Sequence, residues 1–140
     1  MTPVVVDASV GIKWALPEPN SDAARRLLDG ERTLLVPDLF FAEISNTMWK
    51  RVARRDMTLD EARVALRSFD TRSLGVHPSR SLMHLALELA VRSVQTVYDC
   101  LYLALAVIQD CPLVTADHRL YAALEPSPLG AHLLWVANAR

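Results

Sequence analysis

The chain has 140 residues, of which 51% are apolar, 22% charged and 6% aromatic, with 4 glycines and 8 prolines. This composition is that of a folded globular domain, and it excludes disordered and collagen-like proteins. The 15 basic and 16 acidic side chains give a formal net charge of −1, which excludes the strongly basic character of a protein that coats nucleic acid. Any polyanion that the protein binds must therefore meet a local patch of positive charge. Among the basic residues only Lys13 and Lys50 are lysines.

No part of the sequence suits a membrane span or a secretion signal. The longest apolar run, residues 100–108, has nine residues, whereas a spanning helix needs about 20. The first nine residues carry no positively charged side chain and contain Asp7, which is unlike a signal peptide. We therefore expect a cytoplasmic protein without membrane association, in which Cys100 and Cys111 are buried free thiols.

Short apolar runs alternate with helical patterns along the chain. Runs typical of buried strands lie at residues 4–6, 34–36, around 74–76, 113–114 and 133–136. Helical patterns lie at residues 8–16, 21–28, 38–54, 58–69, 79–91, 97–108 and 118–124. The alternation predicts an α/β fold with a mostly parallel central sheet of about five strands flanked by helices. No repeat or linker divides residues 1–140, so we expect one domain.

Two of the predicted helices are expected to form a hairpin. Thr58 followed by Glu61 has the pattern of a capping box, which begins the helix at residues 58–69. Only a few residues separate this helix from the one at residues 38–54, as in a helical hairpin. The hairpin offers apolar positions that either contact a partner protein or belong to the core, such as Trp49, Val52, Leu66 and Phe69.

Four acidic residues are predicted to meet at one edge of the sheet. Asp7 directly follows the first predicted strand, and Asp117 follows the fourth after two further residues. In an open parallel sheet, ligands bind beyond the carboxyl ends of the strands, where the strand order reverses. Glu43 and Asp99 lie early in helices that begin at the same edge, among apolar residues. A charge beside so much apolar surface is costly unless another group compensates it.

Each acid also has a purely structural explanation. Asp7 and Asp117 could be N-caps of the helices that they precede. Asp99 could be the third residue of a capping box opened by Thr96, and Glu43 could stabilise the positive end of its helix. Taken singly, these explanations are common ones, because acids are frequent at helix starts.

Taken together, the four acids indicate a metal site. Four carboxylates at one sheet edge repel one another unless a cation neutralises them. All-oxygen ligation without nearby His or Cys favours Mg²⁺ or Mn²⁺ over zinc. Ser9 and Thr115 each lie two residues from one of the aspartates, so their hydroxyls can hydrogen bond the ligating carboxylates or a bound water.

Four segments of the chain resemble the PIN domain, and in particular the VapC-type toxins of bacterial toxin–antitoxin pairs. They are residues 4–18 with Asp7 and Ser9, the Pro37-Asp38 pair with Glu43, residues 98–106 with Asp99, and residues 115–120 with Thr115 and Asp117. The resemblance runs nearly from end to end. It implies that the four acids bind metal and that Ser9 and Thr115 support them.

The same resemblance implies an Mg²⁺- or Mn²⁺-dependent endoribonuclease that acts as a toxin. RNA would be cut by water attack at the scissile phosphate, in a hydrolysis of phosphodiester bonds. It further implies a homodimer and a cognate VapB-like antitoxin whose C-terminal segment lies across a groove near Glu43. Some PIN domains carry a further acid shortly after the last one, whereas His118 and Arg119 stand here. Both one and two bound metal ions are therefore open.

Two features and two alternative functions stay open. His118 is either part of the site or a solvated residue at a helix start. The basic run at residues 50–55 contacts phosphate or a partner, or it stabilises the C-terminus of its helix. The main alternative is a receiver-like phosphoacceptor signalling domain with an acidic metal pocket. Receiver domains share a lysine that lies late in the chain, whereas this sequence has no lysine after Lys50. A catalytically silent binding module would leave the acids unexplained.

Overall fold

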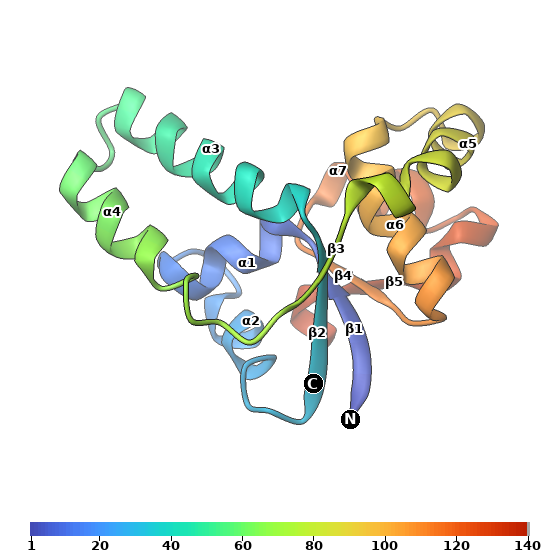
Figure 1. Cartoon of the computed structure of the whole chain (residues 1–140), viewed down its shortest axis with the longest axis horizontal. Coiled ribbons are helices and arrows are strands. Elements are labelled where there is room, and N and C mark those ends of the chain that lie inside the picture. Colours follow the sequence, from blue (N-terminus) through green and yellow to red (C-terminus); the bar gives the residue numbers. More distant parts are fainter. Residues whose placement is uncertain (140) are drawn as a thin grey trace.

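The computed structural model describes residues 1–139 and is built around a five-stranded parallel sheet (Figure 1). The strand order is β3-β2-β1-β4-β5, and each neighbouring pair is parallel. The strands are β1 (Thr2–Val6), β2 (Arg32–Pro37), β3 (Gly75–His77), β4 (Leu113–Thr115) and β5 (Leu133–Trp135). The predicted α/β class and the predicted parallel sheet are confirmed.

Within residues 1–139, seven α-helices connect and cover the strands. They are α1 (Ala8–Ala15), α2 (Ser21–Arg26), α3 (Leu39–Ala53), α4 (Leu59–Arg67), α5 (Met83–Ser93), α6 (Val97–Gln109) and α7 (His118–Leu124). Figure 1 shows α3 and α4 as a hairpin that extends away from the sheet on one side, with α5, α6 and α7 on the other. The capping box at Thr58 and Glu61 is present, with both of its hydrogen bonds at 3.1 Å.

The start of one helix differs from its prediction. The pattern at residues 79–91 predicts a single helix, but the chain forms a 3₁₀ turn at Ser79–Ser81 before α5 begins at Met83. The carboxylate of Asp38 explains this turn, because it accepts hydrogen bonds from both the backbone N–H and the hydroxyl of Ser79. The contact joins the start of α3 to the segment after β3.

The core lies between the sheet and the helices. The last three residues of β1 are fully buried, and α6 has seven buried residues. An aromatic cluster of Trp14, Phe40 and Phe69 packs α1 against α3 and the end of the hairpin, with ring centroids 6.0–6.3 Å apart. Gly11 allows this close approach, since a Cβ atom there would lie 2.5 Å from the Phe40 ring. Phe69 is therefore a core residue and not part of a partner surface, which decides between the two alternatives for this position.

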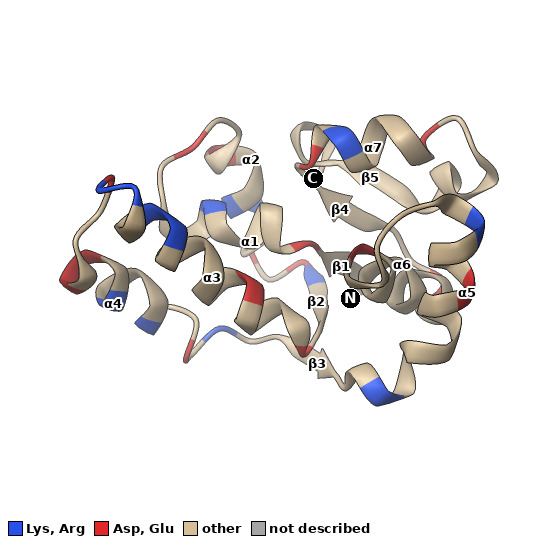
Figure 2. Ribbon diagram, turned by 90° about the horizontal axis from the view of Figure 1, so that it is seen from above, with Lys and Arg blue, Asp and Glu red and all other residues tan. Residues whose placement is uncertain are grey.

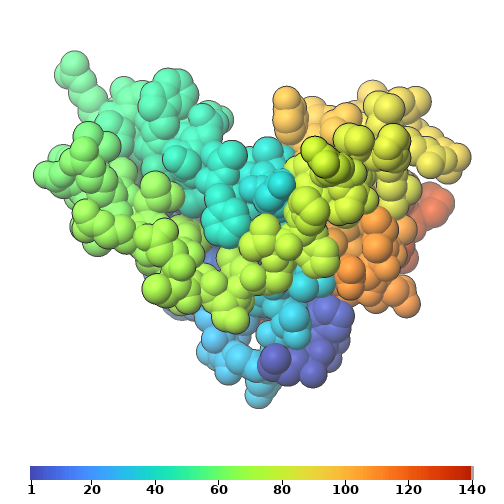
Figure 3. All heavy atoms as spheres, viewed as in Figure 1, coloured from blue at the N-terminus to red at the C-terminus, as the bar shows by residue number. Residues whose placement is uncertain are grey.

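The order of the strands determines where a ligand can bind. From β1 the chain adds β2 and β3 on one side and then returns to place β4 on the other side of β1. The strand order therefore reverses between β1 and β4, and a crevice opens beyond the carboxyl ends of two such strands. Asp7 follows β1 and Asp117 follows β4. Figure 3 shows the molecular surface hollowed between α3 and the yellow and orange segment of α5 and α6.

Within residues 1–139, no single helix is long and apolar enough to cross a membrane. Only α5 and α6 together have the necessary length and composition, and these two helices are bent by 114° at their junction.

Candidate active site

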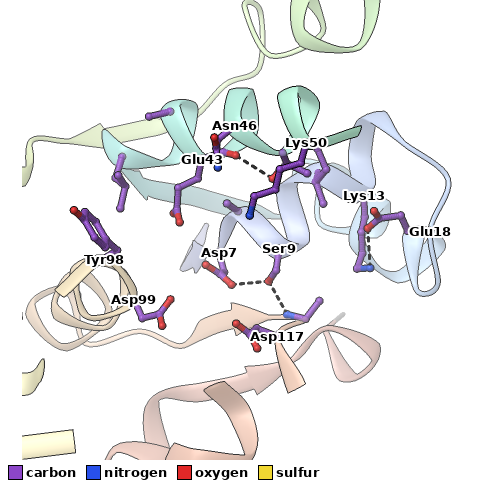
Figure 4. Close-up of a pocket in the computed structure, with 16 residues that line it drawn as sticks. Asp7, Ser9, Lys13, Glu18, Glu43, Asn46, Lys50, Tyr98, Asp99 and Asp117 are labelled. Atoms are coloured by element: carbon purple, nitrogen blue, oxygen red, sulfur yellow. Dashed lines mark hydrogen bonds and ion pairs between the residues drawn. The ribbon is translucent and has the colours of Figure 1, made fainter. Parts of the chain in front are cut away.

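A pocket of about 590 Å³ lies at the crevice between β1 and β4 (Figure 4). Four segments of the chain each contribute one acid to its wall: Asp7 after β1, Glu43 on α3, Asp99 on α6 and Asp117 before α7. From above, red segments of the ribbon lie on α3, between β1 and α1 and at the start of α6, around the middle of the view (Figure 2). The structure therefore brings together all four acids that the sequence singles out.

Asp7 is the most deeply buried of the four acids, with 7% of its surface exposed. Its Oδ2 atom accepts hydrogen bonds from the Ser9 hydroxyl at 2.5 Å and from the Thr115 hydroxyl at 3.0 Å. Burial nevertheless raises the pKa of Asp7 to about 7, because the two hydrogen bonds offset only part of the desolvation and the charges of Glu43 and Asp99 raise it further. Asp7 occupies the N-cap position of α1, as the structural explanation proposed, but its carboxylate makes no capping hydrogen bond to the helix.

Ser9 and Thr115 join the ends of β1 and β4 around the Asp7 carboxylate. The Ser9 hydroxyl also accepts the backbone N–H of Ala116 at 3.0 Å. The Thr115 hydroxyl accepts the backbone N–H of Asp117 at 3.1 Å. Because each hydroxyl is held by a backbone donor, its own proton is directed at the carboxylate. The two residues thus fix the position of Asp7.

Glu43 and Asp99 approach the pocket from the two helices on its opposite sides. The Tyr102 hydroxyl donates a hydrogen bond of 2.6 Å to Glu43 Oε1. Burial raises the pKa of Glu43 despite this bond, and the charge of Asp99 adds to the effect. Burial and the neighbouring charge of Asp117 likewise raise the pKa of Asp99, although Arg119 at 3.5 Å opposes them. Charge repulsion therefore acts across the pocket.

Asp117 and Asp99 combine a structural position with a place in the pocket. The carboxylate of Asp117 accepts the backbone N–H groups of Arg119 and Leu120 at 3.0 and 3.2 Å, so it caps α7 as the structural explanation proposed. At the start of α6, the Thr96 hydroxyl accepts the N–H of Asp99 at 3.2 Å. The carboxylate of Asp99 accepts a hydrogen bond from the Arg119 guanidinium at 3.5 Å.

Several residues of the site were not found by sequence reasoning. Tyr102 is one, and its position three residues after Asp99 places both on one face of α6. Glu18 is another: it lines the pocket and pairs with Lys13 at 3.2 Å and with Arg51. His118 does not line the pocket, and its ring lies 4.4 Å from that of Trp135.

The donors of the pocket fit a hard divalent cation. Carboxylate oxygens are the ligands that Mg²⁺ and Mn²⁺ prefer, and burial together with mutual repulsion raises the pKa of three of the acids, as expected where positive charge is lacking. In the part of the chain described, no three His, Cys, Asp or Glu side chains lie close enough together to coordinate one ion as they are placed. An ion that binds here must draw these side chains inward.

Comparison with known proteins identifies the family. The chain matches the PIN domain over residues 4–124, and it belongs to the PIN-domain family. It is 34% identical over 119 residues to Ribonuclease VapC3 of Pyrobaculum aerophilum, a match that covers 84% of this chain and 91% of that protein. The predicted resemblance to VapC-type PIN domains is confirmed.

Two solved structures share the fold. The structure of PAE2754 from Pyrobaculum aerophilum superimposes with a TM-score of 0.70 at 24% sequence identity, over 97% of this chain and 85% of that one. VapBC2 from Rickettsia felis, bound to a DNA fragment from its promoter, gives a TM-score of 0.63 at 16% identity over 96% and 97% of the two chains.

No finding supports the alternative of a receiver-like signalling domain. Receiver domains of the flavodoxin-like type have the strand order 2-1-3-4-5. The order here is 3-2-1-4-5, with β1 rather than β3 at the centre of the sheet.

Proposed function

We propose that this protein is an endoribonuclease toxin of a toxin–antitoxin pair and that Asp7, Glu43, Asp99 and Asp117 hold its Mg²⁺ or Mn²⁺. The observation that carries this proposal is the meeting of four carboxylates from four segments in one pocket of a PIN-domain fold. The similarity to a VapC ribonuclease supports RNA as the substrate. PIN-domain VapC ribonucleases depend on a metal ion in general.

The chemistry requires no nucleophilic side chain. A divalent cation, when bound, would lower the pKa of the attacking water and neutralise negative charge on the phosphoryl oxygens. The four acids would hold this cation, and Ser9 and Thr115 keep Asp7 in place by their hydrogen bonds. Tyr102 does the same for Glu43. Water then attacks the scissile phosphate in line, the bond between phosphorus and the 3′ oxygen breaks, and a proton from the water leaves that oxygen as a hydroxyl.

This mechanism predicts the ends of the cleavage products. Incubation of the purified protein with total RNA and Mg²⁺ should yield fragments with 5′-phosphate and 3′-hydroxyl ends, because water supplies the new phosphate oxygen. The ends are determined by ligation-dependent sequencing, with the Asp99→Asn protein as a control for contaminating ribonuclease. Cleavage that persists in EDTA and leaves cyclic phosphates would contradict the mechanism, since such products arise from attack by the 2′ hydroxyl.

A VapB-like antitoxin is the expected partner, since a similar structure is that of a VapBC complex. We propose that the antitoxin covers the outer face of the α3–α4 hairpin and reaches the acids with an arginine. Trp49 on α3 is 64% exposed, whereas Val52 on α3 and Leu66 on α4 are half-buried and pack against the core. An exposed tryptophan of this kind is typical of a residue that dominates binding energy. The proposed homodimer is tested by light scattering of the isolated toxin.

Replacement of Trp49 by Ala should weaken antitoxin binding by about 30-fold, equivalent to ~2 kcal/mol, and leave RNA cleavage unchanged. The product of the neighbouring small open reading frame serves as antitoxin in co-purification and calorimetry. Val91→Ala, an exposed apolar position on α5, is the control. Inhibition should also weaken as Mg²⁺ is raised, because an arginine and the metal compete for the same carboxylates. Unchanged affinity in Trp49→Ala would exclude this surface.

Phe69→Ala is unsuitable as a test of the antitoxin surface. Phe69 is 5% exposed and packs on Trp14 and Phe40. Its truncation should lower the free energy of unfolding by about 3–5 kcal/mol, so any loss of binding would report loss of the fold.

A further inference from the structure

We infer that Lys50 contacts an RNA phosphate adjacent to the scissile one, so that the pocket contains a second phosphate subsite two helical turns from Glu43. This inference rests on the proposed ribonuclease function and names how that site holds the chain of its substrate. It follows from the distribution of charge in the pocket, from the position of Lys50 on α3 and from the partners of the other cations.

The pocket is strongly acidic and contains few cations. Five acids and two lysines line it, and these are the only lysines of the chain. Phosphates on either side of the scissile bond each carry a negative charge, so an acidic pocket repels them unless a cation lies beside each one. In the proposed function, the four acids would hold the cation for the scissile phosphate. A neighbouring phosphate requires a different cation.

Lys13 does not supply this cation. It is 8% exposed, and its ammonium group lies 3.2 Å from the carboxylate of Glu18. Glu18 also pairs with Arg51, so one carboxylate holds two cations and joins α3 to the loop after α1. These three side chains keep a net charge of +1, but both cations are held by ion pairs to one carboxylate and form a fixed wall at one end of the pocket.

Lys50 is placed differently. Its ammonium group makes no hydrogen bond or ion pair with any of residues 1–139. It follows Glu43 by seven residues on α3, with Asn46 and Thr47 between them on the same pocket-lining face. At 1.5 Å per residue, its Cα lies about 10 Å further along the helix than that of Glu43. Figure 4 shows the side chain reaching over the pocket toward Asp7 and Ser9.

The structure also separates Lys50 from the rest of the basic run at residues 50–55. Arg51 is held by Glu18. Arg54 lies outside the pocket and pairs with Asp56 at 3.7 Å. Arg55 follows the end of α3 with a left-handed backbone, at a φ angle of 63°. Of the four cations in the run, Lys50 is therefore the one that both faces the pocket and is available to a ligand.

The first experiment measures RNA binding without cleavage. Fluorescence anisotropy with a labelled 12-nucleotide single-stranded RNA in EDTA is recorded over a range of salt concentrations. Lys50→Ala should weaken binding by about tenfold and lower the slope of log affinity against log salt by about 0.7, the value for one phosphate contact on a single strand. Arg54→Ala removes the same charge from the same helix end outside the pocket, and it should leave the slope unchanged. Thermal melting verifies that both exposed variants fold.

The second experiment locates the phosphate. In the RNA site mapped for the wild-type protein, each linkage next to the scissile one is replaced in turn by a neutral methylphosphonate on a 2′-O-methyl nucleotide. One replacement should raise KM about tenfold for the wild type and leave kcat within about twofold, because a phosphate contact remote from the reacting atoms contributes to binding of the substrate and transition state alike. The same replacement should have no further effect on Lys50→Ala.

Each outcome discriminates between hypotheses. If the protein cleaves RNA but Lys50→Ala behaves as Arg54→Ala does in both experiments, the subsite is wrong. If Lys50→Ala loses affinity for the antitoxin but keeps its RNA affinity and salt slope, Lys50 belongs to the antitoxin interface and the inference is overturned. If no RNA is cleaved under any metal condition, the proposed function fails, and the salt slopes still decide whether Lys50 binds a phosphate.

Discussion

Replacement of Asp99 by Asn should abolish RNA cleavage and leave the metal-free protein at least as stable as the wild type. Asp99 lines the same pocket as Asp117, and burial together with this neighbouring charge raises its pKa. The charged form is therefore unfavourable in the folded protein without metal, and the neutral amide removes that repulsion. Loss of a residue that merely supports a metal ligand costs 10–100-fold, so loss of a ligand should reduce kcat by more than about 100-fold.

The matched control for this variant is Asp29→Asn. Asp29 is exposed, lies in the loop before β2 and does not line the pocket. The Asp29→Asn protein loses the same charge as the Asp99→Asn protein. Because this charge lies outside the pocket, the cleavage rate and melting temperature should equal those of the wild type. Thermal melting in EDTA and single-turnover cleavage in Mg²⁺ are measured for all three proteins. An Asp99→Asn protein that unfolds would show that Asp99 is only a structural residue at the start of α6, and one acid would be lost from the proposed metal site.

Strand ends are the part of this site that a sequence reveals best. Asp7 follows a run of three valines, which is typical of a short buried strand, and Asp117 follows a shorter apolar run after two further residues. Parallel strands place their carboxyl ends at one edge, so the two aspartates are predicted to meet before any contact is known. Glu43 and Asp99 follow from the same rule, because helices that leave this edge begin beside it.

Contacts between distant segments are what the sequence does not reveal. The pairing of Glu18 with Arg51 joins residues 33 positions apart, and that of Tyr102 with Glu43 joins residues 59 apart. The hairpin position of Phe69 has the same helical spacing as Leu66, yet the aromatic rings of α1 and α3 bury one and leave the other half-buried. The turn before α5 depends on Asp38, which lies 41 residues earlier in the chain. Such features depend on tertiary packing rather than on local pattern.

The stability of the metal-free protein should fall as the pH rises from 5 to 8. The pKa of Asp7 is raised from 3.8 to about 7, so between these values the folded protein holds a proton that the unfolded chain has released. Stability from this group is therefore fully present below the unfolded pKa and is lost as the pH rises through the folded one. Within this window the loss is at most about 1.4 kcal/mol per pH unit. The raised pKa values of Glu43 and Asp99 act in the same direction.

Mg²⁺ should reverse this pH dependence, because a cation stabilises the charged carboxylates that burial disfavours. The increase in melting temperature on addition of 5 mM Mg²⁺ should thus be several degrees larger at pH 8 than at pH 5.5, where protons compete with the metal for Asp7. Differential scanning calorimetry in EDTA and in Mg²⁺ measures both effects. Asp7→Asn should flatten the pH dependence and remove most of the Mg²⁺ effect, whereas Asp29→Asn should retain both. A metal-free stability that rises from pH 5 to 8 would show that Asp7 is not protonated in the folded protein. An Mg²⁺ effect equal at the two pH values would show that a bound ion does not displace a proton from Asp7.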